Sequence, residues 1–328
     1  MRSKTKMDFP RSTIEAMVRA RFGSSVRIAD VQPLTDGWFN SAYSISFAGG
    51  HPDVVLRIAP DPEMPLLTYE KGLMRSEVKV YELVQQKLSI PLPHLYGYNF
   101  DRDIINHDYM FIARLSGSPL DKVISRIGQE NVNALECELG SYSAQIHSLK
   151  GSRFGYIGDE SGQHNHSWQD AFLGMVFTLL DDGMALGVGL PATYQEIKSV
   201  FSALSPVLLE IRRPSLVHWD LWPPNIFVIQ EKGSYRIEGI VDWERAFWGD
   251  PEAELVLATK PPGSLFFSGY GRGLEDSRSA VIRRCLYRTH LWLVVVIESR
   301  VRFENAEHVK RAYAALERDF QTLRGYLQ

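Results

Sequence analysis

The stretch that most constrains how this chain can fold is LVHWDLWPPNIFVI, which begins at Leu216. Two short apolar runs, typical of buried strands, flank a polar segment that carries His218, Asp220 and Asn225. The two prolines inside this segment lack the backbone donor that a helix interior or a central strand needs. The sequence therefore predicts a stiffened loop between short strands, inside a half of the chain whose pattern is otherwise mostly helical.

The chain divides into a strand-rich beginning and a mainly helical remainder. A capping-box pattern, Ser12-x-x-Glu15, predicts the start of a short helix that ends at Gly23. Alternating patterns and turn residues then predict antiparallel strands, a helix and a further strand, over residues 26–34, 41–49, 53–60, 74–88 and 109–117. Helical spacing predominates afterwards, over residues 134–149, 167–183 and 278–327.

A chain of 328 residues is long enough for about two domains or lobes. We expect an α+β fold with an antiparallel N-terminal β lobe, residues 1–115, that contains one key helix. A larger, mainly helical C-terminal lobe, residues 116–328, would follow an extended connector near Ala113–Leu115.

Bulk composition argues against several classes of partner and location. The net charge of −3 gives no reason to expect nucleic acid or an anionic membrane as partner. The apolar run at 291–297 is far shorter than the ~20 residues that span a bilayer, and no apolar signal segment follows the basic start. Cys137 and Cys285 make neither a disulfide framework nor a zinc pattern, so we expect a cytoplasmic protein. The oligomeric state stays open.

The polar residues of the loop, together with Asp242 at the end of the apolar run GIVD, suit phosphoryl transfer. That reaction needs Mg²⁺ to neutralise phosphate charge and an acceptor hydroxyl held in line with phosphorus. Asp220 is the candidate to accept the hydroxyl proton. Asn225 and Asp242 offer the oxygen ligands that Mg²⁺ prefers. His218 is expected to hold the loop in place rather than to act as the base.

The motifs LVHWDLWPPNIFV and IVDWERAFWGDP resemble those of the aminoglycoside phosphotransferase and choline kinase superfamily, whose fold is similar to that of protein kinases. Hygromycin-phosphotransferase-like members are the most similar, because they share an Asp-Trp motif that runs into a Gly-Asp-Pro type sequence. VLRIAP, RSEVKVYELV, MFIARLSG and IHSLKGSRFG follow in family order. The resemblance implies a bilobal kinase-like fold and the phosphotransferase roles given above to Asp220, Asn225 and Asp242.

The resemblance also implies a phosphate-binding ion pair in the N-terminal lobe. Arg57 stands where protein kinases place a strand lysine, and arginine can grip phosphate with two donors. Glu77 is its expected helix partner, with Glu70 and Glu82 as rivals. Two solvated surface charges are the alternative for Arg57 and Glu77.

Further nucleotide contacts follow from the same resemblance. TDGWFNSAY would form the turn that covers the phosphates, although Gly37 is its one glycine and an ordinary hairpin is equally compatible. The Ala113 carbonyl and Leu115 amide would contact the adenine through backbone atoms. Such contacts leave ATP and GTP both open as the nucleotide.

Four tryptophans, at positions 219, 222, 243 and 248, surround the motifs. They either pack the loop against the helical lobe or line an acceptor pocket for an aromatic, apolar or quaternary-ammonium group. Trp219 stands where many protein kinases carry an arginine that pairs with a phosphate, and no Asp-Phe-Gly follows, so a small-molecule acceptor is favoured over a protein. The nine acidic and twelve basic residues after position 250 weaken an antibiotic acceptor without excluding it.

The sequence thus predicts an ATP/Mg²⁺-dependent phosphotransferase that acts on a small-molecule hydroxyl. The alternative is a catalytically silent nucleotide-binding protein or scaffold, which the arginine at position 57 and the thin covering turn would favour. The sequence does not identify the acceptor.

Overall fold

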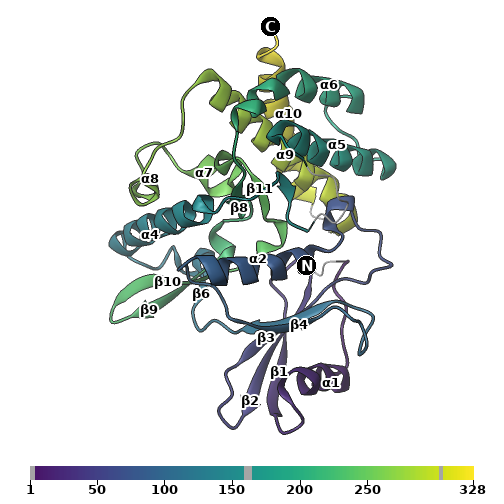
Figure 1. Ribbon diagram of the computed structural model, residues 1–328, viewed down its shortest axis with the longest axis vertical. Helices are drawn as coiled ribbons and strands as arrows, with labels where there is room; N and C mark the ends of the chain where they lie inside the picture. The colour runs from purple at the N-terminus through teal and green to yellow at the C-terminus, as the bar shows by residue number, and fades with distance from the viewer. Residues whose placement is uncertain (1–3, 159–164, 303–305) are drawn as a thin grey trace.

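The computed structural model describes residues 4–158, 165–302 and 306–328. A five-stranded sheet lies at one end of the molecule, a group of helices lies at the other, and the helix α2 (Leu73–Lys87) runs between them (Figure 1). The fold is therefore mixed α and β, with an antiparallel N-terminal sheet and a helical C-terminal region, as predicted.

The N-terminal sheet has the strand order β1-β2-β3-β5-β4, with every neighbouring pair antiparallel. The alternating side chains of the central strands bury Ile45, Leu56 and Phe111 completely, at 0% exposure each. The helix α1 (Arg11–Phe22) adds Ile14 and Met17 to the same core cluster. The strands are β1 (Arg27–Leu34), β2 (Ser41–Ala48), β3 (Val54–Ile58), β4 (Leu95–Asn99) and β5 (Tyr109–Ala113).

The predicted capping box at the start of α1 was wrong. The helix begins at Arg11, and Pro10 occupies the N-cap position without a side-chain hydrogen bond. Glu15 instead forms exposed ion pairs with Arg11 at 3.1 Å and Arg19 at 3.3 Å. A proline has a fixed φ angle that is compatible with a helix start, and with Pro10 rather than Ser12 as the N-cap the helix begins two residues earlier than predicted.

The helical region contains most of the apolar core. Its longer helices are α4 (Gln129–Ser148), α5 (Trp168–Ala185), α6 (Tyr194–Leu204), α9 (Arg278–Arg302) and α10 (Ala306–Gly325). Three shorter ones are α3 (Leu120–Val123), α7 (Leu255–Thr259) and α8 (Leu265–Tyr270). Within the described ranges, no helix is long and apolar enough to cross a membrane.

Helices α4 and α8 approach each other so closely that glycine is required at the crossing. A Cβ atom on Gly140 would lie 2.0 Å from the Phe266 carbonyl oxygen, and one on Gly269 would lie 1.8 Å from the Cys137 carbonyl oxygen. Both obstacles are backbone atoms, which cannot move without moving a helix. The packing of the two helices therefore depends on these two glycines.

Two small sheets interrupt the helices and hold the motif with which the sequence analysis began. One has the order β10-β9-β6 and the other β7-β11-β8. The loop with Asp220 connects β8 to β9, and a single 3₁₀ turn, Pro223–Asn225, closes it. The predicted stiffened loop between short strands is therefore present. The strands are β6 (Ser118–Pro119), β7 (Gly155–Tyr156), β8 (Ser215–Val217), β9 (Ile226–Glu231), β10 (Ser234–Ile240) and β11 (Phe247–Gly249).

Candidate active site

The loop that carries Asp220 is held in shape by its own hydrogen bonds. The Asp220 carbonyl accepts from the Trp222 amide at 3.1 Å and from the Asn225 side-chain amide at 3.0 Å. Trp219, which precedes Asp220, has a φ of 68°, a left-handed conformation that is uncommon for a bulky residue. The surrounding bonds must therefore hold the backbone in this conformation, which fixes where the Asp220 side chain begins.

His218 anchors the loop to the segment that leads into Asp242. Its Nε2 lies 3.1 Å from the Val241 carbonyl oxygen, and its backbone amide donates to Glu254 at 2.8 Å. Its ring packs on Trp243 with the centroids 4.3 Å apart, and the residue is fully buried. These contacts agree with the loop-holding role expected for His218.

The loop and the Asp242 segment are also joined through their backbones. The Val241 amide donates to the Asn225 carbonyl at 3.0 Å, and this bond brings the backbone of Asn225 close to that of Asp242, the residue after Val241. The Asn225 amide nitrogen points to the Asp220 carbonyl, so its side-chain oxygen is the atom left to act as a ligand. An amide oxygen and a carboxylate are hard donors that fit Mg²⁺. The donor set at this position is therefore chemically suited to the predicted metal.

Arg57, near the end of β3, lies at the centre of a cluster of three carboxylates, of which Glu77 and Glu244 are buried and Asp242 is partly exposed. Its guanidinium contacts Glu77 of α2 at 2.6 Å, Asp242 at 2.8 Å and Glu244 at 3.4 Å. The Arg57 side chain is 12% exposed and that of Glu77 is fully buried. The alternative of two solvated surface charges is therefore wrong, and Arg57 connects the sheet, α2 and the segment after β10.

The rival partners of Arg57 are occupied elsewhere. Glu70 is buried and pairs with Arg302 of α9 at 2.5 Å. Glu82 accepts a hydrogen bond from Tyr98 at 3.3 Å. Of the three glutamates considered from the sequence, Glu77 is the one placed against Arg57.

Burial and mutual repulsion raise the pKa values of two of the three carboxyl groups in this cluster. Burial, together with the nearby Asp242 and Glu244 and against the charge of Arg57, raises the pKa of Glu77 to about 8. Burial and the charge of Asp242 raise the pKa of Glu244 to about 7. Burial also acts on Asp242, but the charge and hydrogen bond of Arg57 outweigh it and lower the pKa of Asp242. The lowered pKa favours the ionised form of Asp242, which is the form that the predicted metal-ligand role requires.

Asp220 has a perturbed pKa of its own. Burial raises the pKa of this carboxyl, and Arg245 is the largest opposing charge. The Arg245 side chain is itself held by Glu298 at 2.9 Å and lies over the Trp219 ring at 5.6 Å. A carboxyl with a raised pKa is a better proton acceptor than an ordinary aspartate as long as it remains ionised.

Sequence reasoning missed the buried charges around this site. Glu244 is 4% exposed and belongs to the Arg57 cluster. Arg245 and Arg302 come from segments far apart in the sequence. The one available signal for Glu244 was its position two residues after Asp242, which cannot show on its own which way the side chain points.

Residues 35–40, the part of the expected covering turn that lies between strands, connect β1 to β2. Gly37 does not adopt a left-handed φ, and a Cβ there would meet only the Lys6 side chain at 3.9 Å. Glycine is therefore not required at this position, unlike in a glycine-rich loop. The turn is tied to the Arg57 cluster by Asn40, whose side-chain amide donates to Glu244 at 2.9 Å.

The connector between the sheet and the helical region is held through backbone atoms. The Ala113 amide donates to the His94 carbonyl at 2.8 Å. The Ser116 and Gly117 amides donate to the Glu238 carboxylate at 2.9 and 2.7 Å. Leu115 lies between these anchors and packs so closely on Gly239 that a Cβ there would lie 2.7 Å from it. The structure thus fixes the backbone around Ala113 and Leu115, the atoms expected to contact the adenine.

Three of the four tryptophans near the motifs serve packing. Trp219 and Trp243 are buried at 7% and 0% exposure. Trp248 is partly buried, and its ring lies against Gly151 so closely that a Cβ there would be 2.5 Å from it. Trp222 is 40% exposed and sits between Asp220 and Asn225. It is therefore the tryptophan left as a candidate for contact with an acceptor.

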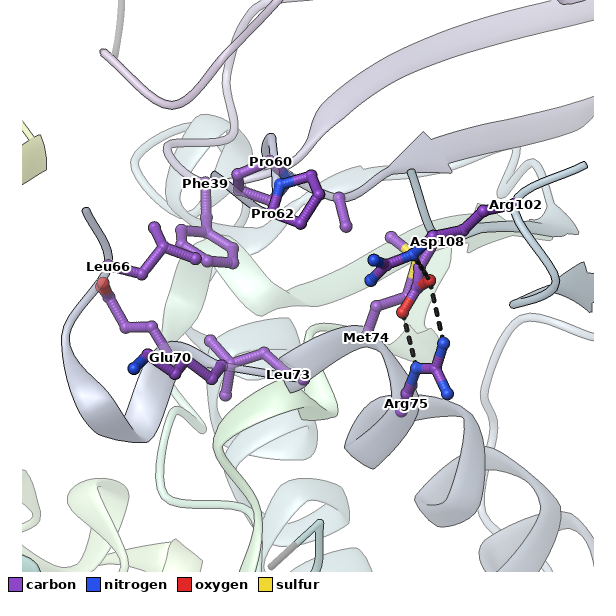
Figure 2. Close-up of a pocket in the computed structure, with 13 residues that line it drawn as sticks. Phe39, Pro60, Pro62, Leu66, Glu70, Leu73, Met74, Arg75, Arg102 and Asp108 are labelled. Carbon is purple, nitrogen blue, oxygen red and sulfur yellow. Dashed lines mark hydrogen bonds and ion pairs between the residues drawn. The ribbon is translucent and has the colours of Figure 1, made fainter. Parts of the chain in front are cut away.

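A cavity of about 270 Å³ lies between the first turn of α2 and the segment after β3 (Figure 2). Its lining includes Phe39 of the turn at residues 35–40 but no residue of the Asp220 loop. Arg75 and Arg102 at one side are already paired with Asp108, at 2.7 and 2.8 Å. The Arg75–Asp108 pair ties the start of α2 to the end of the β4–β5 connection, which helps to fix the helix that carries Glu77.

Comparisons with known proteins agree with this geometry. The model of the phosphotransferase enzyme family matches residues 30–284. No curated protein matched. Three solved structures share the fold over nearly the whole chain, at low sequence identity.

The first is the aminoglycoside phosphotransferase APH(4)-Ia, with a TM-score of 0.63 and 18% identity over 95% of this chain and 99% of that one. The second is aminoglycoside 2′-phosphotransferase-IIIa in complex with GDP, with a TM-score of 0.64 and 15% identity over 96% of this chain and 99% of that one. The third is the streptomycin–ATP–APH(2″)-IIa ternary complex, with a TM-score of 0.61 and 13% identity over 95% of this chain and 97% of that one. Because these scores are so similar, the expected closeness to hygromycin-type members stays a prediction.

Proposed function

Because the chain belongs to the phosphotransferase enzyme family, we propose that it transfers the γ-phosphate of ATP, with Mg²⁺, to a hydroxyl group of a small molecule. The observation that carries this proposal is the junction of the Asp220 loop with the Asp242 segment. There, a partly buried carboxyl with a raised pKa lies on the same short loop as an amide oxygen, and this loop is bonded directly to the segment of an ionised aspartate.

Each residue has one task in the proposed reaction. Asp220 accepts the proton of the acceptor hydroxyl while the hydroxyl oxygen attacks the γ-phosphorus, and the bond from the γ-phosphorus to the bridging oxygen breaks so that ADP leaves. Asn225 and Asp242 would hold Mg²⁺, which neutralises phosphate charge when bound. Arg57, oriented by Glu77 at 2.6 Å, binds the α- and β-phosphates. The covering turn at Gly37 lies over the phosphates, and the Ala113 carbonyl and Leu115 amide hold the adenine.

The identity of the nucleotide rests on backbone contacts in this scheme. Neighbouring structures hold ATP in one case and GDP in another, so the fold accepts both bases. ATP is the proposed nucleotide, and GTP is the alternative that a competition experiment distinguishes.

The acceptor is proposed to be a small molecule that reaches Asp220 past Trp222. A neighbour binds the aminoglycoside streptomycin, which makes aminoglycosides one class to test. The arginines near Asp220 and the basic excess after position 250 favour an acceptor with less positive charge than such antibiotics. Trp222 offers an exposed aromatic face for stacking or for a single cationic group.

The test is an ADP-release screen of the purified chain against aminoglycosides, choline-like amino alcohols, sugars and amino acids. Asp220→Asn should abolish acceptor-dependent ADP release while nucleotide binding persists. Asp276→Asn, at an exposed position, is the matched control and should behave like the unmodified chain. Nucleotide binding without ADP release for any acceptor, and without slow Mg²⁺-dependent ATP hydrolysis, would favour the silent nucleotide-binding alternative.

A further inference from the structure

The beginning of the described chain is built into the covering turn. The Thr5 hydroxyl lies 2.8 Å from the Phe39 carbonyl oxygen and 3.2 Å from that of Trp38, and Thr5 is 2% exposed. The segment that follows is paired with β2, since the Met7 amide donates to the Ser41 hydroxyl at 2.8 Å. Thr5 is therefore a buried polar contact to the turn rather than part of a solvated tail.

The contact with Thr5 fixes the direction of two successive peptide groups. In a trans peptide the carbonyl of one residue and the amide of the next point in opposite directions. The carbonyls of Trp38 and Phe39 face Thr5, so the amides of Phe39 and Asn40 face away from it. Two neighbouring amides that point the same way form the kind of concavity that binds phosphate oxygens.

These amides belong to a turn that is anchored on the charged cluster. The Asn40 side chain donates to Glu244, which in turn contacts Arg57. Gly37 supplies no special backbone conformation here, so the turn must be shaped by contacts from outside. The Thr5 hydroxyl, through its contacts with the Trp38 and Phe39 carbonyls, is placed to hold the backbone of the turn in this conformation.

We propose that Thr5 is a positioning residue for nucleotide binding: its hydroxyl orients the Phe39 and Asn40 amides toward the phosphates. The proposal rests on the function proposed above. It concerns phosphate contacts alone, so the adenosine part of the nucleotide does not depend on Thr5.

The test compares three variants by calorimetric titration with ATP, ADP and adenosine. Thr5→Val keeps the shape and removes the hydroxyl, Thr5→Ser keeps the hydroxyl, and Lys6→Ala is the control. The Lys6 Nζ donates to the Leu34 and Thr35 carbonyls at 3.2 and 3.4 Å and would lie 3.9 Å from a Cβ atom on Gly37, so Lys6 contacts the first half of the turn. Loss of one hydrogen bond predicts about three- to tenfold weaker ATP and ADP binding for Thr5→Val. Adenosine binding should be unchanged, and Thr5→Ser should bind ATP as the unmodified chain does.

Three outcomes would overturn the proposal. The first is ATP binding by Thr5→Val that equals that of the unmodified chain. The second is an equal loss for ATP and adenosine, which indicates a structural role only. The third is the same loss in Lys6→Ala. If the unmodified chain itself bound no nucleotide, the proposed function would fail instead, so the two failures are distinguishable.

Discussion

Replacement of Arg57 by glutamine should destabilise the protein severely, because three carboxylates would lose their shared counter-charge. The carboxylate oxygens of Glu77, Asp242 and Glu244 lie within 4.8 Å of one another. Removal of one partner from a buried ion pair costs about 3–5 kcal/mol. Because Glu77 and Glu244 already have pKa values of about 8 and 7, protonation relieves part of the repulsion at low pH. We therefore expect a loss near 3 kcal/mol at pH 8 and a smaller loss at pH 5.5.

The assay is urea unfolding at both pH values, followed by tryptophan fluorescence. Arg311→Gln is the control, since Arg311 forms an exposed pair with Glu307 in which both side chains are more than half exposed. Such a pair is worth less than about 1 kcal/mol. A loss for Arg57→Gln below about 1 kcal/mol at pH 8 would refute this reasoning, as would a loss that did not grow from pH 5.5 to pH 8.

Three further predictions concern the Arg57 cluster, the α4–α8 crossing and the Asp220 loop. Because the pKa of Glu77 is raised, its contribution to stability is fully present below its unfolded-state pKa of about 4.5 and is lost as pH rises through about 8. Glu77→Gln should therefore flatten the fall in the free energy of unfolding between these two pH values. Gly140→Ala should destabilise by about 2 kcal/mol or more through the α4–α8 clash, whereas Gly174→Ala, in open space on α5, should stabilise by up to about 1 kcal/mol in the same thermal unfolding assay. Arg245→Gln should raise the pKa of Asp220 further and move the acidic limb of the kcat/KM profile to higher pH, and an unmoved limb would show that Arg245 does not act on Asp220.

The local parts of the site could be predicted from the sequence because short spacings fix them. Asp220 and Asn225 lie on one loop closed by two prolines, and Asp242 ends the next hairpin. The choice of Glu77 over its rivals came from a pattern on a helix and a resemblance to known kinases. The structure supplies the pairing with Arg57 itself.

The parts that could not be predicted depend on contacts between distant segments. Glu244 is 187 residues from Arg57 in the sequence, and Thr5 is 34 residues from Phe39. No local pattern indicates such pairs, because a charged or hydroxyl side chain has the same sequence signature whether it is buried or solvated. The failed capping box at Ser12 shows the same limit at short range, where Pro10 decided the helix start instead.

The tryptophans illustrate how burial resolves an ambiguity that composition leaves open. Packing and acceptor recognition both place aromatic residues near a catalytic loop. The structure buries Trp219 and Trp243 and leaves Trp222 at 40% exposure. Recognition of the acceptor therefore becomes a question about one residue, and Trp222→Ala should raise the KM for the acceptor with little effect on that for ATP.

The central claim is that Asp220 accepts a proton during phosphoryl transfer. The most direct measurement is the transfer of label from γ-labelled ATP to the acceptor found in the screen, by the unmodified chain and by Asp220→Asn, alongside their nucleotide affinities. We predict that label transfer falls by at least about 100-fold while the affinity for ATP changes less than about twofold. Label transfer by Asp220→Asn at the rate of the unmodified chain would contradict the account.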